Sequence, residues 1–204
     1  EARELIRWEA HQHVPFDMES VQLDFQILDP YGDGPQMSVL LVAAKRELIE
    51  NRLNLLADAG LSPAVIDVDA FALHNSFEQS YPGSMRGMVA LVNVGHETSN
   101  VNILDEGVPI VVRDIPFGSR RIREALQRER GMTAENAEQV LQGRADAPNL
   151  QAFVAERVDE LAVGIERAIA FITAQSGGEG VDQVYLSGGG ARVPGGVRAL
   201  GERL

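Results

Sequence analysis

The 204-residue sequence contains no cysteine. Disulfides, thiolate catalysis and cysteine-ligated zinc sites are therefore excluded, and the composition is typical of a cytoplasmic protein. Long hydrophobic runs are also missing, since no apolar stretch approaches the roughly 20 residues that cross a bilayer. No signal-peptide pattern opens the chain. We expect no membrane span in this sequence.

Basic residues are scarce. The chain holds 18 basic and 30 acidic residues, for a formal charge of -12. Such a surface repels phosphate backbones and anionic lipid headgroups, so neither nucleic acid nor the membrane itself is an expected direct partner. Lys45 is the only lysine, and no glycine-rich loop precedes it. A P-loop is therefore excluded.

What is present is an ordinary globular composition, 45% hydrophobic and 24% charged. The chain begins at Glu1 and stops at Leu204, in both cases inside a segment with a helical pattern. We expect it to be an internal piece of a longer protein. The turn-rich stretch 79–87, "QSYPGSMRG", is the best domain boundary.

Residue periodicity predicts a different element order on each side of that boundary. Before it we expect helices at 3–13, 47–59 and 70–79 and strands at 21–28, 37–44 and 63–67, the first two strands forming a hairpin. After it we expect strands at 88–94, 98–104, 109–115 and 181–187 and helices at 119–130, 134–142, 150–174 and near Pro194. Three consecutive strands followed by alternating helix and strand are typical of half an RNase H-like or actin-like domain, whereas a Rossmann fold alternates from its start.

Two glycine turns follow predicted strands. In "LVNVGHETSN", 91–100, Gly95 interrupts an apolar run and exposes backbone N–H groups that favour an anion, with Thr98 as a further donor. By itself this turn favours an ordinary hairpin loop over an anion site, since hairpins commonly contain glycine. In "SGGGARVPGG", 187–196, three glycines allow the backbone to approach a flat or anionic group, or form a flexible connection. The dinucleotide fingerprint does not fit their spacing.

The two turns together resemble the actin-like ATPases, the superfamily of actin, Hsp70, sugar kinases and the cell-division protein FtsA. "ALVNVGHETSN" resembles their second phosphate hairpin, and "VYLSGGGARVPG" their adenosine-binding turn. The chain is most similar to the PilM-type assembly proteins of bacterial type IV pili, which its segments match in order over nearly all residues: "IRWEAHQHVPF", "IDVDAFAL", "VRDIPFGSRRI" and "AENAEQVLQG".

This resemblance implies an incomplete α/β actin-like (RNase H-like) fold with a small inserted α+β subdomain. Residues 1–45 would form the inserted subdomain, 46–84 the remainder of the first actin-like half, and 85–204 the second half. The site would bind ATP and Mg²⁺ in a cleft between the halves. The residues it implies for ATP contact are Asn93, Gly95, His96, Thr98, Glu138, Gly188, Gly189 and Gly190, with Asn93 near the metal and Asp69 near the attacking water.

Four departures from the family pattern bear on activity. Asn93 replaces the usual Asp and lacks its charge, so Mg²⁺ affinity should fall. Asp69 stands where Glu is common, and Leu141 where a lysine often follows the Ala-Glu pair, here Ala137 and Glu138. The first phosphate hairpin of the family is absent from these residues. We therefore expect weak nucleotide binding from this piece alone.

Several polar features favour ordinary explanations. His11 and His13 are two residues apart and point to different faces of a helix, which argues against a shared metal. His96 either supports a bound anion or is a solvated loop residue. The run 120–130 holds five arginines and two glutamates, and it is a solvated helix face or a docking surface for an acidic partner.

The favoured function is that of a cytoplasmic platform, peripheral at the inner membrane, that responds to nucleotide with slow or no hydrolysis. By resemblance, its partner is the N-terminal cytoplasmic tail of a bitopic inner-membrane pilus assembly protein, which docks in a groove of the first half; other pilus machinery components are further partners. A metabolite kinase of the same superfamily and an FtsA-like filament protein are the alternatives. A Rossmann oxidoreductase is disfavoured by the strand order.

Overall fold

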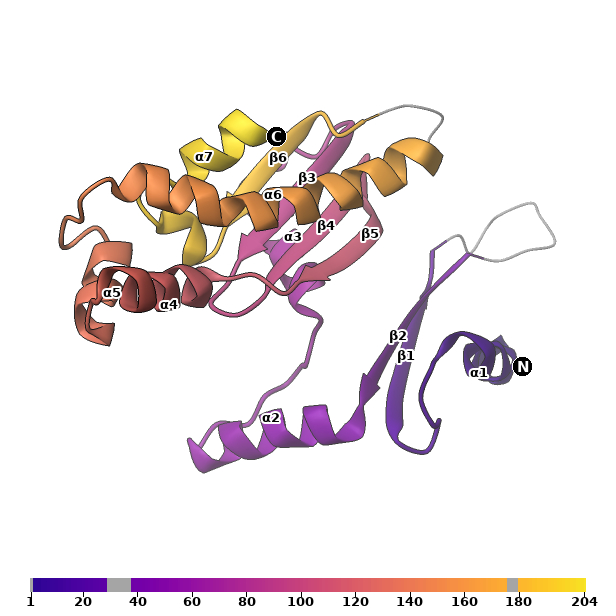
Figure 1. Cartoon of the computed structure of the whole chain (residues 1–204). Helices are drawn as coiled ribbons and strands as arrows, with labels where there is room; N and C mark the ends of the chain where they lie inside the picture. Colours follow the sequence, from indigo (N-terminus) through magenta and orange to yellow (C-terminus); the bar gives the residue numbers. More distant parts are fainter. Residues whose placement is uncertain (1, 29–37, 176–179) are drawn as a thin grey trace. The chain divides into compact units, whose positions relative to one another are not determined.

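The computed structural model describes residues 2–28, 38–175 and 180–204 (Figure 1). The chain divides into two compact units, Glu1–Ile66 and Asp67–Leu204, each of which is described by itself.

The N-terminal unit is a helix, a hairpin and a second helix: α1 (Ala2–His13), β1 (Val21–Ile27), β2 (Val39–Lys45) and α2 (Arg46–Asp58). The strands pair antiparallel from Val21 opposite Lys45 to Ile27 opposite Val39, which confirms the predicted hairpin. The small core of this unit includes Ile6, Ala10 and Val21. Helix α2 buries none of its residues.

The strand predicted at 63–67 is wrong. These residues form no regular secondary structure, and Val65 and Ile66 are 78% and 46% exposed. A strand needs a hydrogen-bonded neighbour, and within the described residues none lies beside this segment.

The C-terminal unit is built on a four-stranded sheet in the order β5-β4-β3-β6. Strands β3 (Met88–Val94), β4 (Ser99–Asp105) and β5 (Val108–Ile115) form the predicted antiparallel meander. Strand β6 (Gln183–Ser187) returns to lie parallel to β3, with Asn93 opposite Ser187. The carboxyl ends of β3 and β6 therefore meet at one edge of the sheet.

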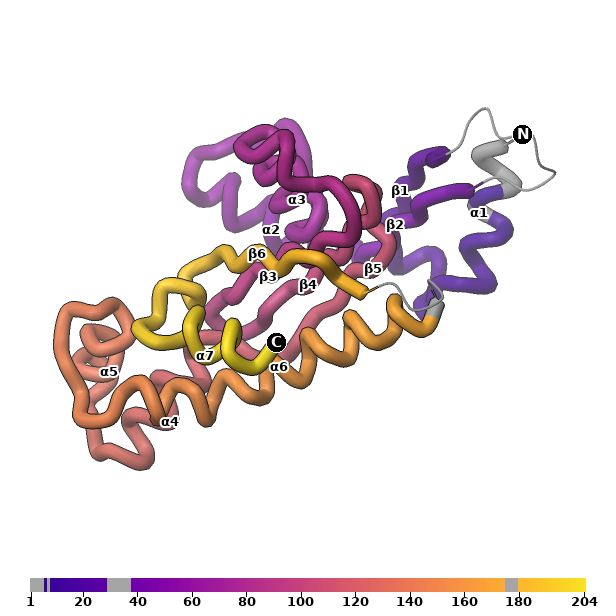
Figure 2. Tube along the Cα trace, turned by 90° about the horizontal axis from the view of Figure 1, so that it is seen from above, coloured from indigo at the N-terminus to yellow at the C-terminus, as the bar shows by residue number. Residues whose placement is uncertain are grey.

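Helices cover both faces of this sheet (Figures 1 and 2). Helix α3 (Asp69–Ser80) lies on one face, where Leu73 and Phe77 pack on Val89 and Leu91. The other face carries the main core and the remaining helices: α4 (Ser119–Arg130), α5 (Ala134–Leu141), α6 (Leu150–Gln175) and α7 (Gly196–Arg203), with a short 3₁₀ turn η1 (Gly190–Arg192). The predicted helices of this half are confirmed, including the Thr133 cap, whose hydroxyl accepts from the Asn136 N–H over 3.2 Å.

The division between the units falls at Ile66/Asp67 rather than in the predicted boundary at 79–87. Helix α3 belongs to the C-terminal unit because its apolar face packs on β3 and β4, and the Asn102 amide donates to the Ala70 carbonyl over 3.2 Å. The assignment of 1–45, 46–84 and 85–204 to an inserted subdomain and two actin-like halves stays a prediction. No helix in the described ranges is long and apolar enough to span a membrane.

Candidate functional site

A cavity of about 680 Å³ opens where β3 and β6 end. Five of the residues predicted to contact nucleotide line it: Gly95, His96, Glu138, Gly189 and Gly190. They come from the β3–β4 turn, helix α5 and the turn after β6, which are far apart in the sequence. The parallel pairing of β3 with β6 brings the two glycine turns to a common wall.

The β3–β4 turn is shaped by Gly95 and held by helix α4. A Cβ atom on Gly95 would lie 2.5 Å from the Thr98 carbonyl oxygen, so a side chain here would push the turn open. The N–H groups of Ser119 and Arg120 donate to the carbonyls of Gly95 and His96 over 3.0 and 2.8 Å. The turn thereby caps α4, and α4 fixes the turn.

This arrangement also sets the direction of the N–H groups in the turn. In a trans peptide the C=O and the following N–H point in opposite directions, and the described residues contain no cis peptide. Because the Gly95 and His96 carbonyls point at α4, the N–H groups of His96 and Glu97 point away from it. They are donors suited to an anion.

The second turn lies against the end of β3. Gly188 has φ of +86°, and an added Cβ would lie 2.6 Å from the Val94 carbonyl oxygen. Gly190 is packed on Val94 and buried. Gly189, by contrast, has no atom within 4 Å of an added Cβ, so its bare backbone borders open space on the cavity wall.

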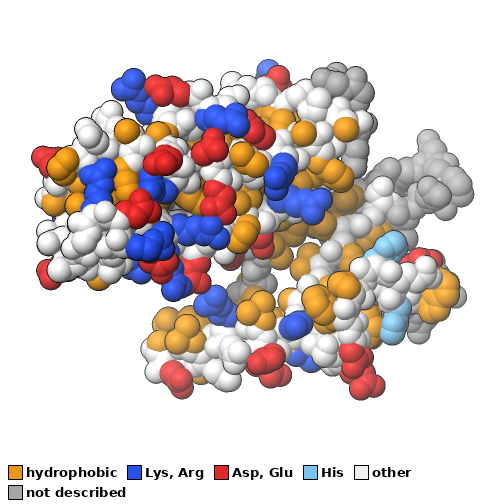
Figure 3. Space-filling model, viewed as in Figure 1, with side chains coloured by type: hydrophobic (Ala, Val, Ile, Leu, Met, Phe, Trp, Pro, Cys, Tyr) orange, Lys and Arg blue, Asp and Glu red, His pale blue; other side chains and the backbone are white. Residues whose placement is uncertain are grey.

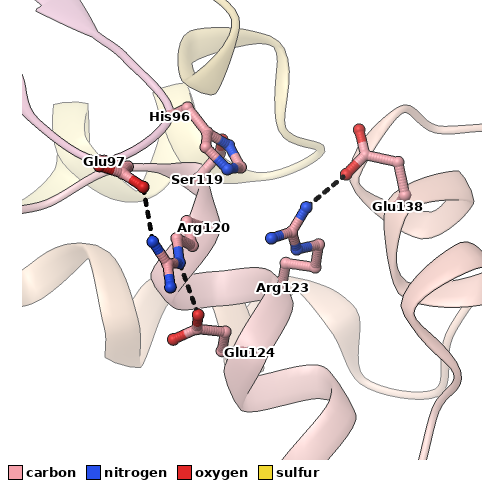
Figure 4. Close-up of polar contacts among 7 residues, drawn as sticks. All are labelled: His96, Glu97, Ser119, Arg120, Arg123, Glu124 and Glu138. Carbon is pink, nitrogen blue, oxygen red and sulfur yellow. Dashed lines mark hydrogen bonds and ion pairs between the residues drawn. The ribbon is translucent and has the colours of Figure 1, made fainter.

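Glu138 is held from two sides. Gln142, one turn later on the chain, donates to its Oε1 over 2.7 Å. A guanidinium nitrogen of Arg123 on α4 lies 3.9 Å from its Oε2 (Figure 4). Both carboxylate oxygens therefore have a partner, and the group is oriented before any ligand arrives.

A cluster of charged side chains lies beside the β3–β4 turn. Arg120 donates to Glu97 over 2.5 Å and to Glu124 over 2.6 Å, and Ser119 Oγ lies 3.4 Å from His96 Nδ1 (Figure 4). The hydrogen bond from Arg120 lowers the pKa of the Glu124 carboxyl. These side chains are exposed, so the pairs orient the turn and contribute little to stability.

Four predicted residues do not line this cavity. Thr98 is exposed in the β3–β4 turn. Gly188 lies directly against the Asn93 side chain. Asn93 lies on the α3 face, where its amide donates to Asn100 over 3.3 Å, and Asn100 in turn donates to Asp114 over 2.5 Å. Asp69 begins α3, which covers that same face. The predicted roles of these four residues stay predictions.

The sequence analysis missed the cations of the cavity. Arg144 follows α5 and Arg192 lies in η1, and both line the cavity, as does Ser119. Arg192 lies within the glycine turn 187–196. Its positive charge beside a proposed anion site could therefore have been recognised from the sequence. Arg144 follows a glycine after a helix, and nothing in its local sequence marks it.

These residues fit a nucleoside phosphate. The cavity offers backbone close to a ligand at Gly189, a fixed carboxylate at Glu138 and two guanidinium groups in an otherwise acidic chain. The fit to Mg²⁺ is weaker, because no group of three or more His, Asp or Glu suited to a metal occurs within the described residues. Asn93, the residue predicted to lie near the metal, does not line this cavity, so its role stays a prediction.

The model of the family "Type IV pilus assembly protein PilM" matches residues 1–204. The solved "PilM-PilN type IV pilus biogenesis complex" is similar at a TM-score of 0.82 and 27% identity, over 100% of this chain and 59% of that one. This chain therefore spans somewhat more than half of the PilM chain that it matches.

Two further solved structures are similar over a smaller share. MreB5 of Spiroplasma citri bound to ADP matches at a TM-score of 0.49 and 12% identity, over 74% of this chain and 56% of that one. The archaeal actin homologue Ta0583 in complex with ADP matches at 0.47 and 16%, over 79% and 51%. The predicted fold class, a mixed α/β actin-like fold of which this chain holds only a part, is confirmed.

Proposed function

The chain belongs to the PilM family of type IV pilus assembly proteins, and we propose that it is the ATP-binding part of a cytoplasmic platform in the inner-membrane assembly complex. The observation that carries this proposal is the cavity shared by Gly95, Glu138 and Gly189. Its wall combines the two glycine turns with a fixed carboxylate, as a nucleoside phosphate requires.

Each part of the ligand would meet a different part of the wall. The His96 and Glu97 N–H groups and the Arg144 and Arg192 guanidiniums would bind phosphate oxygens. The Glu138 carboxylate would accept hydrogen bonds from the ribose hydroxyls. The open backbone at Gly189 would lie against the flat base, because no side chain keeps the base away.

We propose that the protein binds ATP with Mg²⁺ and hydrolyses it slowly or not at all. Asn93 lacks the charge that would concentrate Mg²⁺, and its amide is already hydrogen-bonded to Asn100. Asp69, the proposed positioner of the attacking water, is the first residue of α3. The role of the platform is then to change its affinity for partners with nucleotide, rather than to turn over substrate.

The proposed partner is the N-terminal cytoplasmic tail of a bitopic inner-membrane pilus assembly protein, the counterpart of PilN. The related PilM was solved in complex with PilN, which supports this choice. Binding of that tail would hold the platform at the inner membrane, and other components of the pilus machinery would read its nucleotide state.

Two titrations test this proposal. Calorimetric titration with ATP and Mg²⁺ tests nucleotide binding, and titration of the tail peptide with and without nucleotide tests the coupling to the partner. We expect saturable ATP binding at this cavity and a tail affinity that changes with nucleotide, since coupling is reciprocal between two sites. Equal tail affinity in both conditions would disprove the coupling but leave ATP binding intact. The alternatives have their own readouts: phosphoryl transfer to a small acceptor indicates a kinase, and filaments seen by electron microscopy with ATP indicate an FtsA-like protein.

A further inference from the structure

Strand β5 is an edge of the sheet that the nucleotide cavity does not use. One side of β5 pairs with β4, and on the other side it has no strand partner within the described residues. Exposed edges usually carry charges, especially lysine, because their unpaired N–H and C=O groups otherwise recruit another strand. The stretch from Val108 to Val112 carries no charge at all. Pro109 within it is typical of an edge strand.

Three apolar residues of β5 are exposed: Val108, Ile110 and Val112, at 51%, 42% and 42%. A register shift against β4 falls between Ile103 and Leu104, so they do not form one continuous row on a single face of the sheet. Val112, opposite Asn102, lies on the α3 face. A strand added to β5 would cover part of this exposed apolar surface.

On the other face, a groove of about 540 Å³ runs between β5 and α6. Gly164 allows α6 and β5 to approach closely at the bottom of the groove, because an added Cβ would lie 2.7 Å from Ile115. Phe171, 43% exposed, lies at the side of the groove with Arg113 over its ring at 5.3 Å. Basic side chains border an apolar area over α6 and β5 in Figure 3.

Two arginines and two acidic residues line this groove: Arg113, Arg167, Asp114 and Glu160. Glu160 accepts from Arg121 over 2.5 Å, and Asp114 accepts from the neutral amide of Asn100. No ion pair joins Arg113 or Arg167 to another described residue, and Arg113 lies over the Phe171 ring. Both guanidinium groups can therefore pair with a carboxylate of an incoming ligand.

We propose that β5 and this groove bind an extended, acidic segment of a partner protein as an additional strand of the sheet. Its acidic side chains would face Arg113 and Arg167, and its apolar side chains would cover exposed apolar surface of β5, including Val112. Main-chain hydrogen bonds to β5 would supply affinity. Contacts with the side chains of the segment would supply specificity. The groove shares no lining residue with the proposed nucleotide cavity, so the two sites are separate.

A second copy of the chain is disfavoured as the occupant. Pairing two β5 strands would bring Arg113 and Arg167 of both copies to one interface. The formal charge of -12 on each copy adds repulsion. A short acidic segment of another protein carries far less charge than a second copy and supplies carboxylates to these arginines.

The test uses a short fluorescein-labelled peptide that alternates glutamate and valine, with a peptide that alternates lysine and valine as its control. Anisotropy should show binding of the glutamate peptide only, weakened by salt. The double variant Arg113→Gln/Arg167→Gln should lose about tenfold or more in affinity, whereas the matched surface variant Arg198→Gln should lose none. Hydrogen exchange should slow at β5 amides when the peptide is bound.

Three outcomes would overturn the proposal. They are failure of the glutamate peptide to bind, equal binding by the double variant with an unchanged unfolding midpoint, and slowed exchange that lies elsewhere in the chain. Sedimentation of the chain alone adds a fourth: a dimer that dissociates in the double variant would make a second copy the occupant.

Discussion

The backbone N–H of Ser119 donates a hydrogen bond to the Gly95 carbonyl over 3.0 Å. This single contact joins the first residue of α4 to the turn that borders the cavity. It means that the turn takes its shape from a helix more than 20 residues later in the sequence, and that the donors of the turn are fixed before ligand binds.

The first prediction concerns the contact between Gly118 and the turn. An added Cβ on Gly118 would lie 2.7 Å from the Glu97 nitrogen and against the His96 carbonyl. Gly118→Ala should therefore lower the free energy of unfolding by about 1–3 kcal/mol, as overpacking does, and weaken ATP binding. Urea denaturation and calorimetry measure the two effects.

The matched control for that variant is Gly201→Ala. Gly201 lies in α7 with no atom within 4 Å of an added Cβ, so alanine there should stabilise the helix by about 0.5–1 kcal/mol. ATP affinity should not change. A Gly118→Ala protein as stable as the parent would show that the turn and α4 are not in close contact.

The second prediction separates ligand binding from folding at Gly189. Its backbone is right-handed helical, φ -63°, and space is open around an added Cβ, so Gly189→Val should fold normally. The isopropyl group would occupy the cavity wall and reduce ATP affinity by about tenfold or more, equal to about 1.4 kcal/mol. Calorimetric titration measures the affinity, and thermal unfolding checks the fold.

Gly188→Val is the contrasting variant. It should lower the unfolding midpoint, because φ is +86° and the side chain would meet Asn93 and Val94. If Gly189→Val binds ATP as tightly as the parent, the cavity is not the nucleotide site.

The third prediction assigns Glu138 to the nucleoside rather than to the phosphates. Glu138→Ala should reduce ATP affinity by about 1–3 kcal/mol and leave the affinity for inorganic triphosphate unchanged, because only ATP carries ribose hydroxyls. Arg123→Gln should have a smaller effect of the same kind, since it removes one of the two groups that orient the carboxylate.

Glu135→Ala is the control on the same helix, because Glu135 lies in the first turn of α5 and does not line the cavity. Equal losses for ATP and triphosphate in Glu138→Ala would move the carboxylate's role to the phosphates or the metal.

The fourth prediction concerns the metal. Asn93→Asp restores a charge that favours Mg²⁺, so ATP binding should become more dependent on Mg²⁺. The same change removes the donor of the Asn93–Asn100 hydrogen bond, and stability should fall by about 1 kcal/mol. ATP titrations with and without Mg²⁺ and urea denaturation measure these effects. Asn93→Ala gives the comparison, since it loses the same hydrogen bond and adds no charge.

Much of the fold was readable from local patterns. Helix α6 holds an apolar stripe from Val154 through Ile165 to Ile172, and these residues are buried as the 3.6-residue period predicts. The β3–β4–β5 meander followed from short turns between apolar strands. The strand predicted at 63–67 failed because pairing depends on a neighbour, which no local pattern encodes.

The site divides in the same way. Gly95 and Gly189 were readable because a glycine at the end of a buried strand removes a side chain where close approach matters. Arg144 and Ser119 were missed, since each becomes part of the wall only through the folding of a distant element, whereas Arg192 lies within the glycine turn itself and was overlooked.

By itself the sequence determined the elements, the family pattern and the two glycine turns, because helix and strand periodicity and backbone freedom are local properties. Only the tertiary structure decided that the turns share one cavity, that Asn93 and Asp69 belong to the α3 face, and that β5 pairs with one strand only among the described residues. Those facts depend on strand order and register, which arise from contacts between residues far apart in the chain.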